Sequence, residues 1–219
     1  MIAFEPFEKI RGAFLGRAAG EVSEEFFELK QIHSDRIILL RHFQDAKNNA
    51  GAEADAVICS AWGIPIAVRS ADCVPILIGH PQRVIAALHA GWRGTLAEIL
   101  PKTLRKMREE FKLDLGEVRL AIGPAICKNC YEVGPEVAAA FREKSEAGCL
   151  TPRNDGKFLL DLKSANRVQA LALGLNPEQI EVREECTRCA EQDFFSYRGS
   201  LARGETATGR NYSWVMISP

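Results

Sequence analysis

Short apolar segments rich in β-branched residues dominate the first ninety residues of the chain. From residue 56 onward, only a few residues separate one segment from the next, which is too short for the crossover that joins neighbouring parallel strands. Runs of this length and composition, bounded by turn residues, are typical of buried strands rather than helices. We therefore predict a sheet with antiparallel or mixed pairing, built from strands at 37–40, 56–59, 64–68, 74–78 and 84–88.

After Gly94 the apolar residues change to helical spacing. Residues 96–111 have an apolar stripe with Lys and Arg concentrated toward the end, as the helix macrodipole favours, and Pro101 is expected to kink this helix or delay its start. Further helices are predicted at 135–143 and 163–173, and further strands at 117–122, 180–182 and 212–217. This alternation predicts an α/β fold with a mixed sheet. Without a linker or repeat, residues 1–219 are expected to form a single domain.

The composition is that of an ordinary globular protein, with 47% hydrophobic and 26% charged residues. A net charge of −1 provides no overall field for nucleic acid or an acidic membrane. No apolar run reaches the about 18 residues of a membrane span, and Met1–Lys9 lacks the apolar core of a signal peptide. We therefore expect a cytoplasmic protein without nucleic-acid or membrane partners, whose seven cysteines are reduced.

Three metal-binding side chains lie at the ends of predicted strands. His33 precedes the first of the listed strands, Cys73 lies in a turn between two strands, and His89 lies where a strand runs into a glycine-rich turn. Two imidazoles and a thiolate suit Zn²⁺ and leave the fourth tetrahedral position open, which is typical of a catalytic zinc site. The same ligands suit copper, which binds more tightly than zinc to equal ligands.

Two other interpretations of these residues stay open on spacing alone. Free cysteine is among the most buried residue types, so Cys73 and His89 can equally be core residues with His33 on the surface. Alternatively, Cys73 is the nucleophile and His89 the base of a Cys–His hydrolase. That arrangement leaves His33 without a role.

Three arginines are candidates for binding an anion. Gly91-Trp-Arg-Gly94 directly precedes a helix, so its backbone N–H groups and Arg93 can hold phosphate or carboxylate. Arg198 and Arg210 lie beside aromatic residues, a mixture that can stack a planar base and hold an oxyanion. A tight turn with solvated arginines explains the same pattern.

Two C-x-x-C pairs, Cys127/Cys130 and Cys186/Cys189, have the composition of a four-cysteine structural zinc site. The usual gap between such pairs is about 15–20 residues, whereas residues 131–185 separate these and contain two predicted helices. The spacing therefore favours thiols that are simply buried or idle over a second zinc site. An oxidation-prone dithiol is the other alternative.

Two specific blocks follow one another in the sequence, Ala71-Asp-Cys73 and His89-Ala-Gly-Trp-Arg-Gly94. They belong to an ordered set of motifs: Gln31–Ser34, Asp55–Val57, Ser70–Leu77, Ala87–Gly94, Ala121–Ala125, Tyr131–Gly134, Phe195–Arg198 and Thr208–Arg210. Together these motifs resemble the YfiH-type family, long labelled "laccase domain" or polyphenol oxidase and later described as purine nucleoside phosphorylases. The resemblance runs from about residue 31 to the end.

The resemblance implies a zinc site made by His33, Cys73 and His89 within a layered α/β fold similar to that of Cys–His hydrolases. It also implies phosphorolysis of adenosine, inosine and related nucleosides, with inorganic phosphate as the second substrate, and adenosine deamination as an additional activity. A copper-dependent, laccase-like polyphenol oxidase is the alternative, although multicopper sites use many more histidines than the four present here. A binding module that retains a metal without turnover is a further alternative.

Roles follow for the remaining candidates. Asp72, beside the thiolate of Cys73, is expected either to orient a histidine or to take a proton, unless it merely forms a turn. Arg93, helped by Arg198 and Arg210, is expected to hold phosphate. Residues 1–30 depart from the family pattern as a short, divergent segment in which only Gly16–Gly20 corresponds, and Ala125 replaces a cysteine found in many members.

Overall fold

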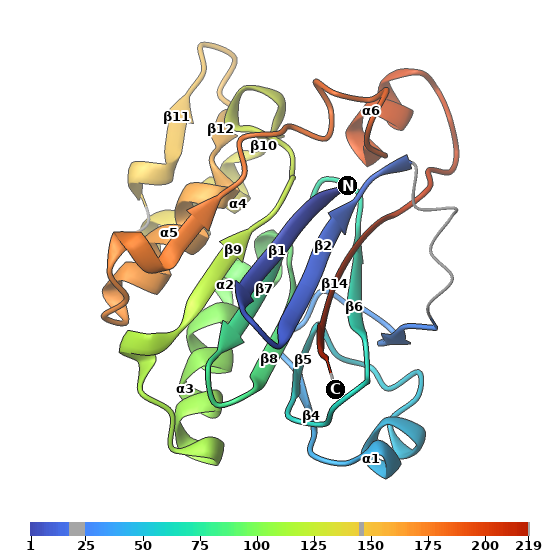
Figure 1. The fold of residues 1–219 in the computed structure, drawn as a ribbon. Helices are drawn as coiled ribbons and strands as arrows, with labels where there is room; N and C mark the ends of the chain where they lie inside the picture. The colour runs from blue at the N-terminus through green and yellow to red at the C-terminus, as the bar shows by residue number, and fades with distance from the viewer. Residues whose placement is uncertain (18–24, 145–146, 219) are drawn as a thin grey trace.

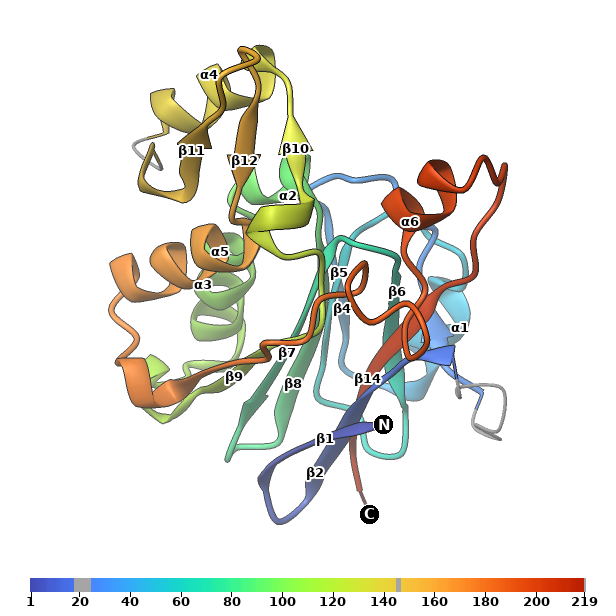
Figure 2. The same ribbon diagram turned by 90° about the horizontal axis from the view of Figure 1, so that it is seen from above.

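The computed structural model describes residues 1–17, 25–144 and 147–218, and their elements form three layers (Figures 1 and 2). A six-stranded sheet lies in the middle, with a five-stranded sheet against one face and helices against the other (Figure 2). A small three-stranded sheet lies beside the helical layer, with α4 (Pro135–Glu143) packed on it (Figure 2). These layers confirm the predicted α/β fold with mixed sheets.

The central sheet combines antiparallel and parallel pairs. Its order is β13 (Ile180–Val182), β9 (Arg119–Ile122), β7 (Val74–His80), β8 (Val84–Ala90), β5 (Ala56–Cys59) and β4 (Ile37–Leu40). The inner pairs β9–β7, β7–β8 and β8–β5 are antiparallel, whereas the outer pairs β13–β9 and β4–β5 are parallel. Among these pairs only β7 and β8 are joined by a short connection, and they are antiparallel as predicted. The strand expected at 64–68 lies instead in the five-stranded sheet, at Ile66–Ser70.

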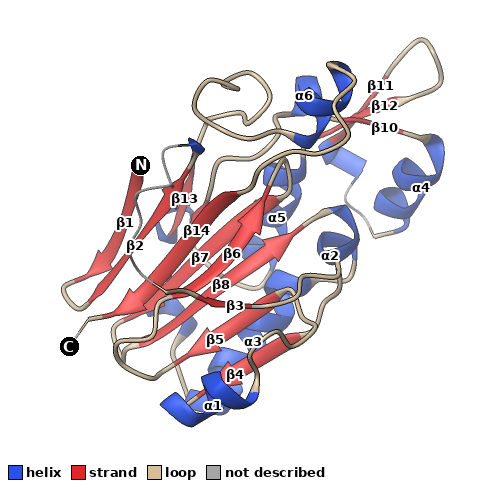
Figure 3. Cartoon of the chain, turned by 90° about the vertical axis from the view of Figure 1, so that its right-hand side faces the viewer, coloured by secondary structure: helices blue, strands red, loops and turns tan. Residues whose placement is uncertain are grey.

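The two other sheets complete the strand inventory of the described residues. The five-stranded sheet has the order β1 (Ile2–Phe7), β2 (Ile10–Leu15), β14 (Asn211–Ile217), β6 (Ile66–Ser70) and β3 (Phe27–Glu28). The three-stranded sheet has the order β10 (Glu132–Val133), β12 (Phe158–Leu160) and β11 (Leu150–Pro152). Figure 3 shows the strands of the two large sheets stacked in front of the helices.

The central strands β7 and β8 are apolar along most of their length because both faces of the sheet are covered. On β7, Ile76 and Ile78 pack toward the helical layer, whereas Leu77 between them packs toward the five-stranded sheet. On β8, Leu88 and Ala87 divide between the two faces in the same way. Side chains alternate across a strand, so burial on both faces yields a continuous apolar run instead of a polar–apolar alternation.

The predicted helix at 96–111 is two helices in the structure. α2 (Trp92–Leu96) and α3 (Ile99–Phe111) are separate helices. Glu98, the N-cap residue of α3, has a left-handed backbone (φ 60°) that interrupts the helical path between them. Pro101 lies in the first turn of α3, where proline is tolerated, and so it delays the helix rather than kinking it. The other helices are α1 (Phe43–Asn48), α4 as predicted, α5 (Leu162–Ala172) and α6 (Tyr197–Ala202). No helix among the described residues is long and apolar enough to cross a membrane.

The sequence analysis predicted no strand before residue 37, but β1 and β2 form a hairpin whose second strand pairs with β14. Phe14 of β2 is fully buried between the two large sheets. The short strands lack a long apolar run, so only their pairing with the C-terminal strand reveals them. Of the segment Gly16–Gly20 that matched the family pattern, residues 18–20 lie outside the described part of the chain.

A substitution at Gly123 tests how closely Phe14 of the β1–β2 hairpin packs on the central sheet. A Cβ atom there would overlap the Phe14 ring and lie 2.9 Å from Cγ of Pro75. We expect Gly123→Ala to lower the free energy of unfolding by about 1–3 kcal/mol, because overpacking forces side chains and backbone to shift. Urea denaturation measures this change. Gly148→Ala is the matched control, since a Cβ at Gly148 meets no atom within 4 Å; equal effects of both substitutions would contradict the packing.

Candidate metal centre and adjoining cavities

Three segments bring His33, Cys73 and His89 together at one end of the central sheet. His33 lies in the loop before β4, Cys73 lies in the turn between β6 and β7, and His89 lies near the end of β8. Their ligand atoms are all within 4.8 Å of one another. The two imidazole rings have centroids 4.9 Å apart and planes at 77°, so the rings are not stacked. The structure therefore assembles the trio that the sequence predicted.

A buried carboxylate, Asp55, holds two of these ligands in place. Its oxygens accept backbone N–H bonds from Ile32 (3.2 Å), His33 (3.0 Å) and Ser34 (2.6 Å), and a bond from the Ser34 hydroxyl (2.8 Å). Nδ1 of His89 lies 2.9 Å from Oδ1 of Asp55. Because an ionised carboxylate only accepts, the imidazole donates through Nδ1, and its Nε2 is left to bind a metal.

Sequence reasoning noted Asp55 only as part of a motif and gave it no function. The residue is completely buried at the start of β5. Burial opposes its ionisation, but the bonds from His89 and Ser34 lower the pKa of Asp55 to about 2. The carboxylate is therefore charged at neutral pH, and an acidic residue directly before a buried strand was the available signal.

Two residues at the trio have a strained backbone. His33 (φ 59°) and Asp72 (φ 90°) have left-handed backbones, which are costly for residues with a side chain. Gly91 passes so close that an added Cβ would lie 3.0 Å from Sγ of Cys73 and 3.2 Å from Cδ2 of His33. The glycine-rich turn after His89 is thus needed for the close approach of the backbone to the ligands.

Asp72 has a different partner set from the one predicted. One oxygen accepts bonds from the hydroxyls of Thr187 and Ser196, and the other accepts the backbone N–H of Arg198, each at 2.7 Å. None of these donors is a histidine, and none belongs to the turn of Asp72 itself. Asp55, not Asp72, binds the His89 ring and orients it. Asp72 instead binds the segment 187–198 to the turn that carries Cys73. A catalytic role for Asp72 stays a prediction.

Two cavities meet at the trio and share the side chains of His33, Cys73 and Tyr197. The larger has a volume of about 700 Å³ and is also lined by His89 and Arg210. Ligand pockets commonly have volumes of about 300–1,000 Å³, so this cavity has room for a small organic molecule. The smaller, of about 190 Å³, has room only for a compact group.

The three candidate arginines divide between these cavities. Arg93 and Arg198 both line the smaller one, whereas Arg210 lines the larger. Aromatic rings support the first two, since the guanidinium of Arg93 lies 4.3 Å from the Trp92 ring centroid and that of Arg198 lies 5.2 Å from that of Tyr131. The smaller cavity is thus a cationic recess beside the trio, and Arg210 is separated from it.

The donor set fits a divalent metal ion. Burial opposes ionisation of Cys73, yet His89 and His33 lower the pKa of its thiol to about 6, so a thiolate is present at neutral pH. Burial also opposes the charge on His89, but Cys73 and Asp55 raise the pKa of this imidazole to about 9. A thiolate and two imidazoles suit zinc and copper alike, with one tetrahedral position left for a non-protein ligand.

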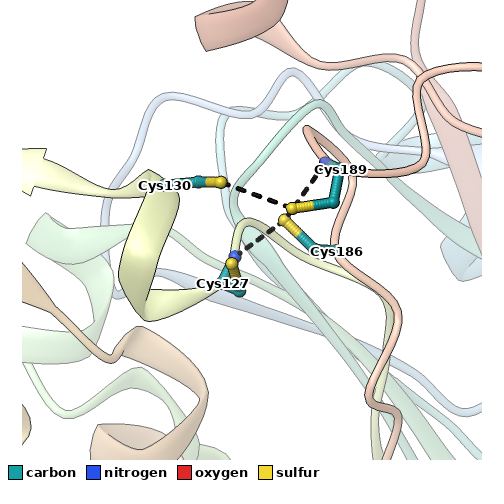
Figure 4. A group of neighbouring side chains, drawn as sticks. All are labelled: Cys127, Cys130, Cys186 and Cys189. Atoms are coloured by element: carbon teal, nitrogen blue, oxygen red, sulfur yellow. Dashed lines mark hydrogen bonds between the residues drawn. The ribbon is translucent and has the colours of Figure 1, made fainter.

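A second cluster, of four cysteines, corrects the interpretation drawn from spacing. Cys127, Cys130, Cys186 and Cys189 have sulfur atoms that all lie within 4.8 Å of one another (Figure 4). The parallel pairing of β9 with β13, extended by a bridge between Ala125 and Cys186, places the two pairs side by side. Residues 131–185 belong to the connection between the parallel strands β9 and β13. The length of this connection therefore does not determine how far apart the two C-x-x-C pairs lie in space.

A sequence model of the family described as "Multi-copper polyphenol oxidoreductase laccase" matches residues 11–218. The chain belongs to this family. The resemblance to YfiH-type, laccase-domain proteins is thereby confirmed, and a crystal structure of the Bacillus licheniformis hypothetical protein YfiH has the same fold, with a TM-score of 0.82 and 27% identity over 92% of this chain and 79% of that one.

Named relatives of this laccase-domain chain are enzymes of purine nucleosides. "Adenosine deaminase RL5", from an unknown prokaryotic organism, is 36% identical over 191 residues, covering 82% of this chain and 72% of that protein. A purine nucleoside phosphorylase of Bacteroides thetaiotaomicron is 35% identical over 227 residues, covering 96% and 80%. The crystal structure of YlmD from Geobacillus stearothermophilus has a TM-score of 0.85 and 26% identity, covering 99% of this chain and 94% of that one. These relatives support an enzyme of this family.

Asp55→Asn tests the carboxylate that holds the two histidine ligands. An amide offers an N–H where Asp55 now accepts, so it disturbs both the His33 loop and the Nδ1 bond of His89. We expect metal affinity to fall by about 10–100-fold, the usual effect of losing such a supporting partner. Competition with a chromogenic chelator measures the affinity. The control is Asp35→Asn, at an exposed ion pair with Lys102; equal affinities of the two variants would contradict the role of Asp55.

Proposed function

We propose that this chain is a zinc-dependent purine nucleoside phosphorylase that acts on adenosine, inosine and related nucleosides. The observation that carries the proposal is the meeting of a large cavity and a small cationic cavity at His33 and Cys73. Phosphorolysis needs two substrates of unequal size, a nucleoside and inorganic phosphate, to meet at one carbon atom. The names of the relatives from Bacteroides thetaiotaomicron and Deinococcus radiodurans support the same reaction.

The reaction exchanges one bond at the ribose for another. The bond between C1′ and the purine nitrogen breaks, and the purine departs with the electron pair and takes up a proton. A phosphate oxygen forms the new bond to C1′. Positive charge develops on the ribose meanwhile, so a phosphate anion held against C1′ stabilises the transition state.

Arg93 and Arg198 are the residues that we assign to phosphate. Both line the small cavity, and the rings of Trp92 and Tyr131 support their guanidinium groups. Guanidinium groups match phosphate oxygens with two parallel donors. The nucleoside then occupies the larger cavity, where Arg210 is available to its polar edge. Asp72 acts by positioning, since it binds the backbone N–H of Arg198.

The metal ligands are His33, Cys73 and His89. A bound zinc ion supplies Lewis-acid and electrostatic stabilisation at the junction of the two cavities. The chain's own part is to hold this geometry. Asp55 fixes the tautomer and direction of the His89 ring and ties down the loop of His33. Gly91, which has no side chain, lets the backbone pass close to Cys73 and His33.

Adenosine deamination is a second candidate activity of the same site. The relative named adenosine deaminase matches 82% of this chain. Deamination replaces the amino group at purine C6 by an oxygen from water and releases ammonia. It requires the large cavity and the metal centre but no phosphate, so Arg93 and Arg198 would not contribute to it.

The deciding experiment measures metal content and turnover on one preparation, purified without added metal. We expect zinc in the protein and release of hypoxanthine from inosine only when phosphate is present. We also expect Cys73→Ala to lose the zinc ion held by His33, Cys73 and His89 and to abolish turnover, because the trio loses its thiolate. Oxygen uptake with phenols that rises with copper loading would instead identify a polyphenol oxidase. Metal retention without either turnover would identify a binding module. Unchanged zinc and turnover in Cys73→Ala would overturn the site assignment.

The division of the arginines gives a separate kinetic prediction. Arg93→Ala and Arg198→Ala should each raise the KM for phosphate by about 10–100-fold, since a hydrogen bond to a charged group contributes about 1.5–3 kcal/mol. Neither should raise the KM for inosine comparably. Arg210→Ala should have the reverse pattern, because Arg210 lines the other cavity. Steady-state kinetics with each substrate varied in turn measures both constants, and a phosphate KM that changes most in Arg210→Ala would refute the assignment.

A further inference from the structure

The four cysteines of Figure 4 lie outside both cavities and have no part in the proposed reaction. Cys127 directly precedes the short 3₁₀ turn Lys128–Cys130, and Cys130 is its last residue. Cys186 and Cys189 lie in the segment that follows β13. We propose that these four cysteines bind one structural Zn²⁺, a site separate from the catalytic centre, which we call the cysteine clasp.

The spacing of the sulfur atoms fits a tetrahedral ion. With Zn–S bonds of about 2.3 Å, the sulfurs of a tetrahedral site lie about 3.8 Å apart. In the clasp, Sγ of Cys130 and Sγ of Cys189 are 3.5 Å apart, and all four sulfurs are within 4.8 Å of one another. These separations are compatible with a four-cysteine zinc site.

Two backbone N–H groups favour a thiolate at Cys186. Sγ of Cys186 accepts the backbone N–H groups of Cys127 (3.2 Å) and Cys189 (3.4 Å), bonds that a sulfur ligand commonly receives. Arg188, between the last two cysteines, donates to the carbonyl of Cys130 at 3.3 Å and brings a positive charge to the cluster. Four thiolates with no open position are typical of a structural rather than a catalytic zinc ion.

The clasp joins two segments where regular pairing ends. Beyond the bridge between Ala125 and Cys186, the backbone N–H of Thr187 still bonds Ala125 (3.2 Å), and the chain then continues through turns toward α6. A metal ion that joins 127–130 to 186–189 therefore closes a long loop. Closing such a loop removes entropy from the unfolded chain and stabilises the fold.

The chain continues from each joined segment into a residue that lines the small cavity, Tyr131 after the first and Arg198 after the second. Tyr131 directly follows Cys130, and its ring faces Arg198, which the segment after Cys189 carries. Thr187, between Cys186 and Cys189, and Ser196, after Cys189, bind Asp72, the neighbour of Cys73. The clasp thus holds Tyr131 and Arg198, on two walls of the small cavity, at a fixed separation. The existence of the clasp does not depend on the proposed function, whereas its effect on phosphate binding rests on it.

Counting zinc in the full-length chain tests the clasp without any assay of activity. The chain is purified under reducing conditions without added metal, and zinc per chain is measured by mass spectrometry. With both centres filled we expect two zinc ions in the unaltered chain, one in Cys73→Ala, one in Cys130→Ser/Cys189→Ser, and none in the combined variant. Cys59→Ser is the thiol-loss control, because Cys59 is buried on β5 away from both clusters.

Two further measurements test the clasp even if a cysteine variant folds poorly: the absorption spectrum of bound Co²⁺, and zinc retention in a variant with a substitute ligand. Co²⁺ added to metal-free Cys73→Ala should give the thiolate charge-transfer absorption of a four-sulfur site. This absorption should disappear in the same chain with Cys130→Ser/Cys189→Ser. Cys189→His should retain the zinc, since three cysteines and a histidine also form structural zinc sites, whereas Cys189→Ser should release it more readily to a chelator.

The results that overturn the clasp differ from those that overturn the catalytic proposal. A Cys73→Ala chain without zinc or cobalt binding, or a disulfide between the two C-x-x-C pairs in the freshly purified chain, would refute the clasp. If the unaltered chain holds one zinc that only the clasp substitutions remove, the clasp stands and the catalytic zinc fails. If both zinc ions are present but phosphorolysis is not, the proposed reaction alone fails.

Discussion

The buried carboxylate of Asp55 is the interaction on which the candidate catalytic centre depends. Four donors from residues 32–34 and one ring nitrogen of His89 converge on its two oxygens. Such a group is costly to bury unless its bonds are complete. Its bonds in turn hold His33 in a left-handed backbone and aim His89 at the same point. One side chain thereby makes two ligands from distant segments into a single metal-binding surface.

Two further groups extend this arrangement from the metal centre to the cavities. Asp72 reaches across to Thr187, Ser196 and Arg198, and so ties the C-terminal segment to the turn that carries Cys73. The cysteine clasp, as proposed, holds the same segment from its other end. Both cavities are lined by cations, Arg93 and Arg198 in the smaller one and Lys30, Arg69 and Arg210 in the larger one. Their difference in volume, about 190 Å³ against about 700 Å³, is what favours a compact anion and a larger partner meeting at the trio.

Much of the fold could be predicted from local sequence. Strands such as β5 and β13 and helix α4 have the predicted bounds, because continuous apolar runs and proline at a helix start are signals contained within a few residues. The N-terminal hairpin gave no such signal, since its strands are defined by pairing with β14 at the other end of the chain. The break between α2 and α3 was likewise missed, because it depends on the left-handed backbone of Glu98.

By itself, the sequence determined the residue types and the strand ends that carry them. Histidine and cysteine at the ends of buried strands predicted the trio, because a rigid sheet presents such positions at one edge. Tertiary structure alone decided which groups meet. It made Asp55 rather than Asp72 the partner of His89, separated Arg210 from the other two arginines, and joined two C-x-x-C pairs through parallel pairing of β9 and β13. The physical reason is that sheet register sets distances between residues independently of how many residues lie between them.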